Sequence, residues 1–389
     1  MGTITESAKA FMPKLSEIRR DFHMHPEVSQ HEERTGKKVA EYLKEMGCDE
    51  VYENVGGYGV VGVIKGKKPG KVVALRADMD ALQIQEMNEV PYKSQNDGVM
   101  HACGHDNHMT GLLGAAMLLC ERREEIAGTV KLIFQPAEEM SPVGGSRGML
   151  HSGYMDDVEA VFGLHVWPDL PHGKIGVKAG PLMAATDHFT INIHGKTAHG
   201  AKPNQGIDAV VLGSQFVMAA QTIVSRKVDP LDNAVVTFGI FNAGTRYNII
   251  AGDCTLDGTV RTLNEDTRAM IEDSMRKTLD GLCLQSGATA DINYGHGYPA
   301  LVNHEEDAEL IRNTAIKLFG KDDVVDVKLP AMPAEDFSFY LKEKKGAFVW
   351  LGTAKQDQDP VWPLHNSRFD VDESALLLGV CAELSFALR

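Results

Sequence analysis

Short apolar runs alternate with helical segments through the first half of the chain. One helical segment, Thr110–Cys120, is apolar nearly all round, and the short runs occupy residues 60–64, 72–75, 130–134 and 160–164. Short runs of this kind are typical of strands buried on both faces, and an all-apolar helix packs on a sheet rather than facing solvent. The pattern predicts an α/β fold with a mostly parallel mixed sheet.

The hydrophobic pattern changes from about Phe189. Phe189–Ile193 alternates at period two, and later segments predict a helix, two strands, a helix and a strand, at 207–226, 234–241, 254–260, 265–284 and 288–294. This β-α-β-β-α-β order is that of a ferredoxin-like α+β domain. After about Tyr298 helix and strand alternate again. We therefore expect one discontinuous domain, residues 1–184 and 296–389, with residues 185–295 inserted in it.

The length and charge of the chain limit its partners. At 389 residues it is too long for a single ordinary core. The net charge is 39 − 54 = −15, which argues against a nucleic-acid or anionic-membrane partner. No run approaches 18 apolar residues, and no secretory signal is expected. Six scattered cysteines predict reduced thiols in a cytoplasmic protein.

Potential metal ligands follow the apolar runs. Asp78 follows the run at 72–75, and Glu138, Glu139 and His165 stand just after the later runs. His365 lies a short way beyond a further buried strand expected at residues 346–351. Because ligand sites in open α/β sheets lie at the carboxyl ends of strands, we expect these side chains to converge on one rim. Cys103 and His105, on the loop that enters the apolar helix, can join them.

The run from His101 to His108 holds three histidines and a cysteine in eight residues. Thiolate, imidazole and carboxylate ligands together suit zinc, manganese, cobalt or nickel. The candidate ligands outnumber what one catalytic zinc needs, which favours two divalent metal ions per subunit. In the adjacent pair Glu138-Glu139, one carboxylate can hold a metal while the other acts as general base on a water.

Several neighbouring residues have supporting roles or open alternatives. His101, His108 and Asp78 are expected to hydrogen-bond to the ligands and fix their orientation. Asp106 can support the site or act as a helix N-cap. Cys103 could instead be a thiolate nucleophile, although the surplus of metal-binding residue types favours ligation.

Two glycine-rich segments match motifs that their context does not support. Residues 57–62 fit the dinucleotide fingerprint, but the segment continues as a strand and no helix follows it. Residues 144–148 fit the nucleophile-elbow pattern without a strand directly before them. The first is rejected, and the second is expected to be a loop beside the metal rim.

Four segments together resemble the M20 metallopeptidase family, and more closely its amidohydrolase branch of hippurate hydrolases, N-acyl-amino-acid amidohydrolases and auxin-conjugate hydrolases. They are residues 75–82, 100–106, 134–139 and 364–367. The resemblance implies a zinc-peptidase-like catalytic domain with an inserted ferredoxin-like lid that forms a homodimer. It implies that Glu138 is the general base and that the metal ligands are Cys103, His105, Glu139, His165 and His365.

The resemblance also assigns residues of the inserted domain. His199, in Gly195–Gly200, is similar to the family histidine that reaches the partner subunit's active site and stabilises the oxyanion. Asn248 and Arg261 are similar to the positions that hold the substrate's carboxylate. Without the resemblance, Arg261 at a strand end is more often a surface charge.

The expected activity is hydrolysis of an N-acyl amino acid, of the hippurate or N-acetyl type, to a carboxylic acid and a free amino acid. A dipeptidase or carboxypeptidase that uses the same residues is the enzymatic alternative. A metal-binding protein without catalysis is the alternative from another class, and the presence of Glu138 beside a full ligand set argues against it.

Overall fold

The computed structural model describes residues 2–355 and 361–387 and separates them into two compact units. Unit 1 contains the residues up to Gly180, Val302–Leu329 and the residues from Asp336 onward, and unit 2 contains Pro181–Leu301 and Pro330–Glu335. The chain passes between them through β7 (Gly180–Met183) and β14 (Leu301–Asn303). The domain boundaries after residue 184 and before residue 296 stay a prediction.

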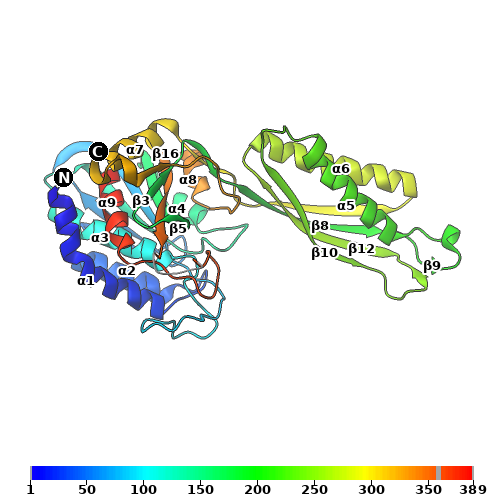
Figure 1. Ribbon diagram of the computed structural model, residues 1–389, viewed down its shortest axis with the longest axis horizontal. Coiled ribbons are helices and arrows are strands. Elements are labelled where there is room, and N and C mark those ends of the chain that lie inside the picture. The colour runs from blue at the N-terminus through cyan, green and yellow to red at the C-terminus, as the bar shows by residue number, and fades with distance from the viewer. Residues whose placement is uncertain (1, 356–360, 388–389) are drawn as a thin grey trace. The chain divides into compact units, whose positions relative to one another are not determined.

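Unit 1 is built on a mixed sheet with the strand order β1-β2-β4-β3-β5-β16-β6-β15 (Figure 1). The central strands β4, β3, β5 and β16 are parallel, whereas β1, β2 and β4 pair antiparallel and β6 is antiparallel to β16. The bounds are β1 Glu50–Val55, β2 Gly59–Lys65, β3 Lys68–Asp78, β4 Ala127–Gln135, β5 Ala160–Pro171, β6 Ile175–Val177, β15 Val324–Asp326 and β16 Lys345–Ala354.

The predicted apolar runs are the buried centres of these strands. Leu75 of β3 pairs with Leu132 of β4 and with Phe162 of β5, and all three side chains are fully buried. The mixed α/β fold is therefore confirmed, with four parallel strands in the middle of the sheet and a further parallel pair, β6 and β15, at one edge. β1 escaped prediction because most of its residues are partly or fully exposed and leave no apolar run.

Helices cover both faces of this sheet. α3 and α9 contact the central strands, and α1, α2 and α7 pack around them. α8 contacts β16 on the other face, where Phe337, which immediately precedes it, meets Phe348. The bounds are α1 Gly2–Met24, α2 Glu33–Glu45, α3 His105–Glu121, α4 Ser146–Leu150, α7 Glu305–Phe319, η2 Lys321–Asp323, α8 Ser338–Glu343 and α9 Ala375–Ala387.

The predicted apolar helix is α3, and it begins earlier than the apolar run does. Its first residue is His105, and Gly104 before it has a φ of +88°. A Cβ on Gly104 would lie 2.4 Å from Cγ2 of Val166, so only glycine lets the helix start this close to β5. The prediction of Asp106 as N-cap is wrong, because Gly104 holds that position and no side chain caps the helix.

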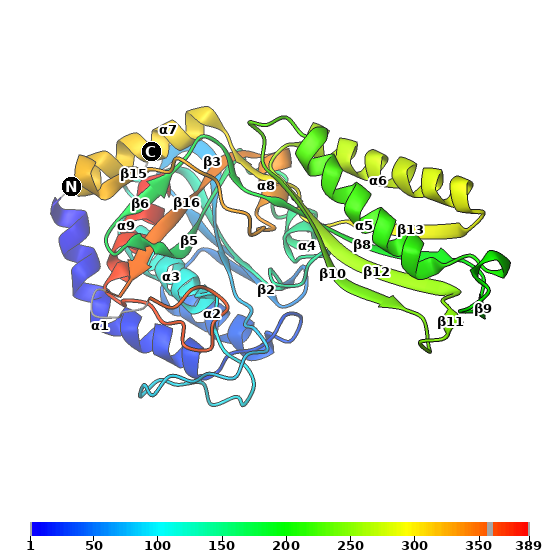
Figure 2. The same cartoon turned by 45° about the vertical axis from the view of Figure 1, so that its right-hand side comes forward.

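Unit 2 has the element order that the sequence predicts, β-α-β-β-α-β. Its antiparallel sheet has the order β10-β12-β8-β13, with the helices α5 and α6 packed on it. A small ribbon, β9 against β11, extends from the same unit (Figure 2). The bounds are β8 Ala185–His194, β9 Ala198–His199, η1 Pro203–Gln205, α5 Ala209–Arg226, β10 Ala234–Ala243, β11 Ile249–Ile250, β12 Asp253–Thr262, α6 Glu265–Ser286 and β13 Thr289–His296.

Among the residues that the structure describes, no helix combines the length and the apolar character needed to cross a bilayer. α9 is the most apolar of the helices and packs in the core of unit 1. It contains Glu383, whose side chain is 1% exposed and whose Oε2 atom has no hydrogen-bond partner in the described chain. Burial raises the pKa of this carboxyl well above its ordinary value.

Replacing Glu383 by Gln should raise the free energy of unfolding at neutral pH by about 1–3 kcal/mol. The folded state keeps a proton on Glu383 that the unfolded state releases above its ordinary pKa of 4.5, so this group costs stability increasingly as the pH rises from there. Urea unfolding of both proteins at about pH 4 and about pH 8 measures the difference. A gain of the same size at both pH values would contradict the ionisation argument.

Candidate metal centre

The carboxyl ends of three neighbouring strands supply most of the candidate ligands. Asp78 is the last residue of β3, Glu138 and Glu139 follow the end of β4, and His165 lies in β5 where it pairs with Trp350 of β16. These strands are parallel, so their ends share one edge of the sheet. Glu138 and His165 are 5% and 4% exposed, whereas His365, which contacts Glu139, is an exposed residue.

Cys103 lies at the centre of the cluster. Its Sγ atom is 3.4 Å from Nε2 of His165 and 3.2 Å from Nε2 of His365. Nε2 of His365 is also 3.2 Å from Oε1 of Glu139. His105 lies on the other side of that carboxylate, with its Nε2 3.9 Å from the same oxygen. The five predicted ligands therefore lie together in unit 1.

Two overlapping groups of donor atoms form inside this cluster. Cys103, His105 and His165 offer ligand atoms within 4.8 Å of one another, and so do Cys103, Glu139 and His365. A further group joins Glu138 to His105 and Glu139 at the same spacing. Two groups that share a ligand match the expectation of two ions, and their mixture of sulfur, nitrogen and oxygen suits borderline divalent metals.

Hydrogen bonds fix which nitrogen of His165 is free. Its Nδ1 lies 2.6 Å from the carbonyl oxygen of Val166, so Nδ1 carries the proton and Nε2 presents a lone pair toward Cys103. His108 acts on the same peptide, because the backbone N–H of Val166 donates to Nε2 of His108 at 2.9 Å. His108 thus supports the ligand His165 through the backbone of β5 and not by a hydrogen bond to the His165 side chain.

Asp78 holds His108 in that tautomer. Nδ1 of His108 donates to Oδ1 of Asp78 at 2.6 Å, while Oδ2 of Asp78 accepts from Nη1 of Arg76 at 2.7 Å. Arg76 is itself buried and donates through Nη2 to Asp336 at 3.0 Å. The charges of His105 and Arg76, and then the hydrogen bond from His108, keep the pKa of Asp78 well below its ordinary value, despite its burial.

Asp80 is a functional residue that the sequence reasoning left without a role. Its two carboxylate oxygens accept from the backbone N–H groups of Glu138 and Glu139, at 3.1 and 2.9 Å, and from the Ser29 hydroxyl at 2.6 Å. Oδ1 also lies 3.3 Å from Nδ1 of His105. The spacing of Asp80 could have indicated a role. It stands two residues after Asp78 at the end of a strand, so the two side chains are expected on the same face.

Asp336 is a second buried carboxylate to which the sequence assigned no role. Its carboxylate accepts from Gln135 Nε2 at 2.8 Å and from the backbone N–H of Ser146 at 2.9 Å, in addition to Arg76. Its own backbone N–H lies 3.4 Å from Oε1 of Glu138. This side chain ties the loop after β4 to the segment before α8.

The donor set fits a bound cation. Both ring nitrogens of His105 and Oε1 of Glu139 are buried without a hydrogen-bond partner in the described chain. Burial, and then the negative charges of Glu139 and Glu138, raise the pKa of the Cys103 thiol well above its ordinary value. Negative charge and polar atoms without hydrogen-bond partners thus accumulate at one place, and a divalent cation offsets both.

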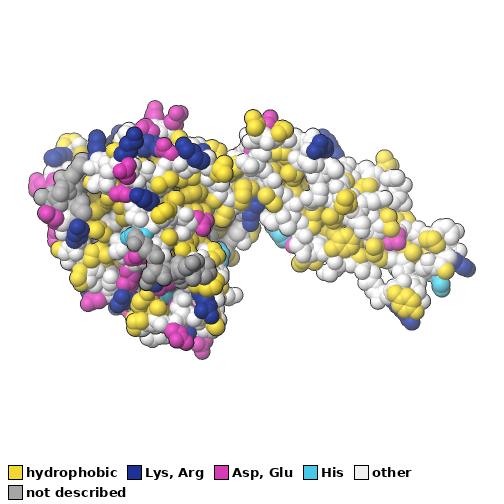
Figure 3. Space-filling model, viewed as in Figure 1, with side chains coloured by type: hydrophobic (Ala, Val, Ile, Leu, Met, Phe, Trp, Pro, Cys, Tyr) yellow, Lys and Arg dark blue, Asp and Glu magenta, His cyan; other side chains and the backbone are white. Residues whose placement is uncertain are grey.

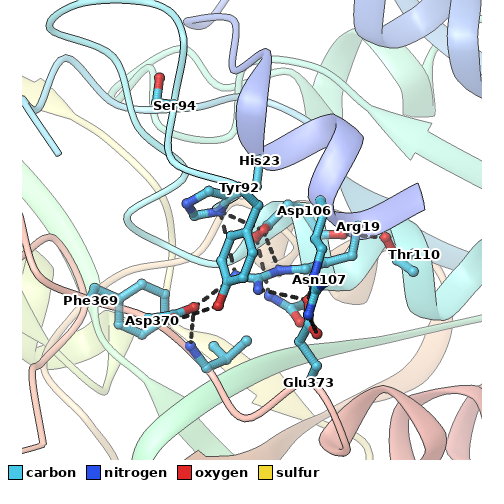
Figure 4. A network of polar contacts seen from close by, with 12 residues as sticks. Arg19, His23, Tyr92, Ser94, Asp106, Asn107, Thr110, Phe369, Asp370 and Glu373 are labelled. Carbon is cyan, nitrogen blue, oxygen red and sulfur yellow. Dashed lines mark hydrogen bonds and ion pairs between the residues drawn. The ribbon is translucent and has the colours of Figure 1, made fainter. Parts of the chain in front are cut away.

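A second polar network lies behind the first turn of α3 (Figure 4). Asp106 accepts from Arg19 Nε at 2.8 Å and lies 2.8 Å from Nδ1 of His23. Arg19 also donates to Asp370 at 3.0 Å and to Glu373 at 3.2 Å. The expected supporting role of Asp106 is therefore to join α1 and the segment before α9 to the helix that carries His105.

His101 does not make the hydrogen bond expected of it. Its side chain is 1% exposed, and neither ring nitrogen has a hydrogen-bond partner in the described chain. Burial lowers its pKa to about 4, so the ring is neutral at physiological pH. It lies beside His23, with the ring centroids 6.5 Å apart.

The three predicted substrate-contacting residues all belong to unit 2, but they do not gather at one place. His199 and Asn248 are neighbours, since Gly200 N donates to the carbonyl oxygen of Asn248 at 2.8 Å. Arg261 pairs with Thr186 at the opposite end of β12 from Asp253, which pairs with His194. At about 3.3 Å per residue, the eight steps from Asp253 to Arg261 span roughly 26 Å.

The sequence of this chain matches the model of peptidase family M20/M25/M40 over residues 74–388. The match covers all the ligand-bearing segments described above. The chain belongs to this family.

Curated relatives agree with that assignment over nearly the full length. The chain is 43% identical to the putative amidohydrolase YhaA of Bacillus subtilis, with 94% of this chain and 91% of that protein aligned. It is 40% identical to thermostable carboxypeptidase 2 of Saccharolobus solfataricus, over 96% and 95% of the two chains. It is 44% identical to the N-acyl-L-amino acid amidohydrolase of Geobacillus stearothermophilus, over 74% and 77%.

Solved structures share the whole fold. A putative aminohydrolase from methicillin-resistant Staphylococcus aureus matches with a TM-score of 0.93 and 38% identity, over 99% of this chain and 98% of that one. The YxeP protein of Bacillus subtilis, described as a dinuclear metal-binding peptidase of the M20 family, matches with a TM-score of 0.86 and 37% identity over 98% of both chains. The donor groups of this chain and the metal-binding relative together support divalent metal binding.

Replacing Asp80 by Asn should lower metal affinity about 10- to 100-fold, because an amide cannot accept from the backbone N–H groups of both Glu138 and Glu139 while it also faces His105. Competition with a chelator measures the affinity. Ser29→Ala is the matched control, since it removes one of the same hydrogen bonds and leaves the carboxylate, so its loss should be smaller. Unchanged affinity in a folded Asp80→Asn protein would show that Asp80 does not position the ligands.

Proposed function

We propose that this protein is a metal-dependent amidohydrolase that cleaves N-acyl amino acids, of the hippurate or N-acetyl type, into a carboxylic acid and a free amino acid. The observation that carries the proposal is the grouping of five ligand side chains, Cys103 among them, with a further buried carboxylate, Glu138, beside them. The family and the relatives named amidohydrolase support a hydrolase that acts on amides.

The residues that would hold two divalent ions are Cys103, His105, Glu139, His165 and His365. When bound, such metals acidify a water and polarise the amide carbonyl. The donor set suits zinc or manganese, and cobalt or nickel as well. A thiol ligand must stay reduced, and on that ground we propose a cytoplasmic location.

Glu138 is the proposed general base and acid. Asp80 fixes its backbone at 3.1 Å, and its Oε1 faces the backbone N–H of Asp336, so the carboxylate is held beside the ligand cluster without being one of the five ligands. In this role Glu138 takes a proton from the attacking water and passes it to the nitrogen of the leaving amino acid. The burial of Glu138 itself limits competition from bulk water for that proton.

Unit 2 supplies the substrate contacts in this proposal. Nδ1 of His199 accepts from the backbone N–H of Ala201 at 3.0 Å, so a neutral His199 carries its proton on Nε2 and can donate it to a developing oxyanion. Arg261 has a buried Nη1 atom without a hydrogen-bond partner in the described chain, and Asn248 has such an atom in Oδ1. A substrate carboxylate satisfies the guanidinium, whose pKa burial lowers against the charge of Asp187.

A homodimer formed through unit 2 would bring these groups onto one substrate. His199 and Arg261 lie at opposite ends of unit 2, too far apart for one small N-acyl amino acid to reach both in a single copy. We therefore infer that His199 and Asn248 act on the partner's site and that Arg261 acts on its own. Unit 2 then serves as the lid and dimerisation domain.

The surface of unit 2 supports this assembly. β10 is an edge strand of the sheet, and Ile240 and Phe241 on it are 48% and 41% exposed. The neighbouring face of α5 exposes uncharged side chains, among them Val211 and Met218. Figure 3 shows apolar side chains gathered over this part of unit 2. An open strand edge beside an apolar helix face is suited to pairing with a second copy.

Carboxypeptidase or dipeptidase action is the second candidate. The relative named thermostable carboxypeptidase 2 is 40% identical over nearly the whole chain, and the same residues can cleave a peptide bond next to a free carboxylate. Parallel assays of hippurate, N-acetyl amino acids and dipeptides, each with zinc, manganese, cobalt and nickel, separate the two. A strong preference for dipeptides would reject the N-acyl amino acid assignment.

Glu138→Gln should keep the metal content of the wild type and lower kcat by at least about 10²-fold, because an amide cannot accept the proton of the attacking water. Metal analysis and steady-state kinetics on the same sample test both parts. This variant also tests the alternative of a metal-binding protein without catalysis. Full activity in Glu138→Gln would remove Glu138 from the role of general base.

Mixing His199→Ala with Glu138→Gln chains should restore activity that neither variant has alone. In a mixed dimer one site combines an intact Glu138 with His199 of the partner subunit, so an equal mixture should reach about a quarter of wild-type activity. Light scattering checks that the dimer forms, and native mass spectrometry of the mixture checks that subunits exchange. A confirmed mixed dimer without activity would contradict the contribution of His199 to the partner's site.

A further inference from the structure

The six cysteines are scattered in the sequence, yet two of them meet in unit 1. They lie at the end of α3 opposite to His105. Cys48 follows α2 and Cys120 lies in the last turn of α3, and their Sγ atoms are 3.9 Å apart although 72 positions separate them. Both side chains are partly exposed, so small oxidants can reach them. Neither residue belongs to the site proposed above.

The backbone around Cys48 holds its thiol in place. Gly47 ends α2 with a φ of +80°, its N–H donates to Lys44 O, and the N–H of Cys48 donates to Leu43 O, both at 3.1 Å. This pair of bonds is a Schellman motif, which fixes the residue after the glycine. Cys120 lies in the buried helix α3, so both thiols are carried by ordered backbone.

Arg123 links the two sides and makes one thiol more acidic. Its guanidinium donates to Gly47 O and Asp49 beside Cys48, and its Nη2 lies 3.9 Å from Sγ of Cys120. The hydrogen bond from Cys48, and then the positive charge of Arg123, lower the pKa of Cys120, whereas the same hydrogen bond and burial raise that of Cys48. The carboxylate of Asp49 acts against this effect but is paired with Arg123.

We propose that Cys48 and Cys120 are a thiol–disulfide site that exchanges with low-molecular-weight disulfides. The Cys120 thiolate attacks one sulfur of a disulfide RSSR, forming a mixed disulfide and releasing one thiolate RS⁻. Cys48 then loses its proton and attacks the Cys120 sulfur, which expels the second RS⁻. Two protein thiols are oxidised to one disulfide, RSSR is reduced to two thiols, and each RS⁻ takes up one proton.

Bond formation requires the two sulfur atoms to approach by about 2 Å, to the normal S–S length of about 2.05 Å. Rotation about the Cα–Cβ bonds can supply most of that approach, because the backbones already lie beside each other through Arg123. The disulfide would tie the turn after α2 to the end of the helix whose first residue is His105. The other four cysteines include the proposed ligand Cys103 and the partly exposed Cys283, neither of which is part of this pair.

The test treats the metal-loaded, reduced protein with oxidised glutathione and maps the products by mass spectrometry without reductant. The expected product links the tryptic peptides 45–65 and 94–122 and consumes two thiols per chain, and dithiothreitol reverses it. Peptide 94–122 also contains Cys103, so fragment ions must place the link at Cys120. A link to Cys103, or no linked peptide, overturns the proposal.

Single substitutions separate the roles of the two thiols. Cys48→Ser should stop the reaction at a stable mixed disulfide between glutathione and Cys120, whereas Cys120→Ser should prevent both products. Arg123→Gln should slow the first step about threefold or more, because less of Cys120 is thiolate. Cys283→Ser is the matched control and should behave as the wild type. A mixed disulfide that forms first on Cys48, or an unchanged rate in Arg123→Gln, contradicts the assignment of Cys120 as the attacking thiol.

Discussion

Sulfur, nitrogen and carboxylate groups are packed around Cys103, most of them at least partly buried. In isolation such an arrangement is unfavourable, since a thiol beside the carboxylates of Glu138 and Glu139 resists ionisation and both ring nitrogens of His105 lack a hydrogen-bond partner in the described chain. The surrounding fold holds the groups there despite that cost. Asp80 holds the Glu138–Glu139 backbone, and Gly104 allows α3 to start against β5. A cation bound by these residues would offset the unfavourable electrostatics of the cluster.

Much of this arrangement could be predicted from local sequence patterns. Apolar runs predict strands because burial on both faces imposes a composition that is visible without knowing the partners, as at Leu75 and Phe162. Ligand residues directly after those runs, such as His165, then fall at one sheet edge by geometry alone. The element order of unit 2 followed from periodicity in the same way.

The remainder depended on contacts that leave no local pattern. Arg76 reaches Asp336 across 260 positions, and Cys48 reaches Cys120 across 72. The prediction started α3 too late because its first turn is polar as well as buried. Arg19 of another helix pairs with Asp106 in that turn, and no apolar pattern marks it in the sequence. His101 was expected to hydrogen-bond because histidines near metals usually do, but its pocket offers it no partner in the described chain.

The order in which the chain is synthesised bears on when unit 1 can be completed. His365 meets Cys103 across 262 positions, and Arg19 of the first helix meets Asp370 across 351. A ribosome therefore exposes the first helix and the thiol of Cys103 long before their last partners emerge. Most of unit 2 is one continuous stretch, so its core can close while unit 1 is still waiting. Metal loading at the full site is consequently a late event in the life of the nascent chain, and the free Cys103 needs protection until then.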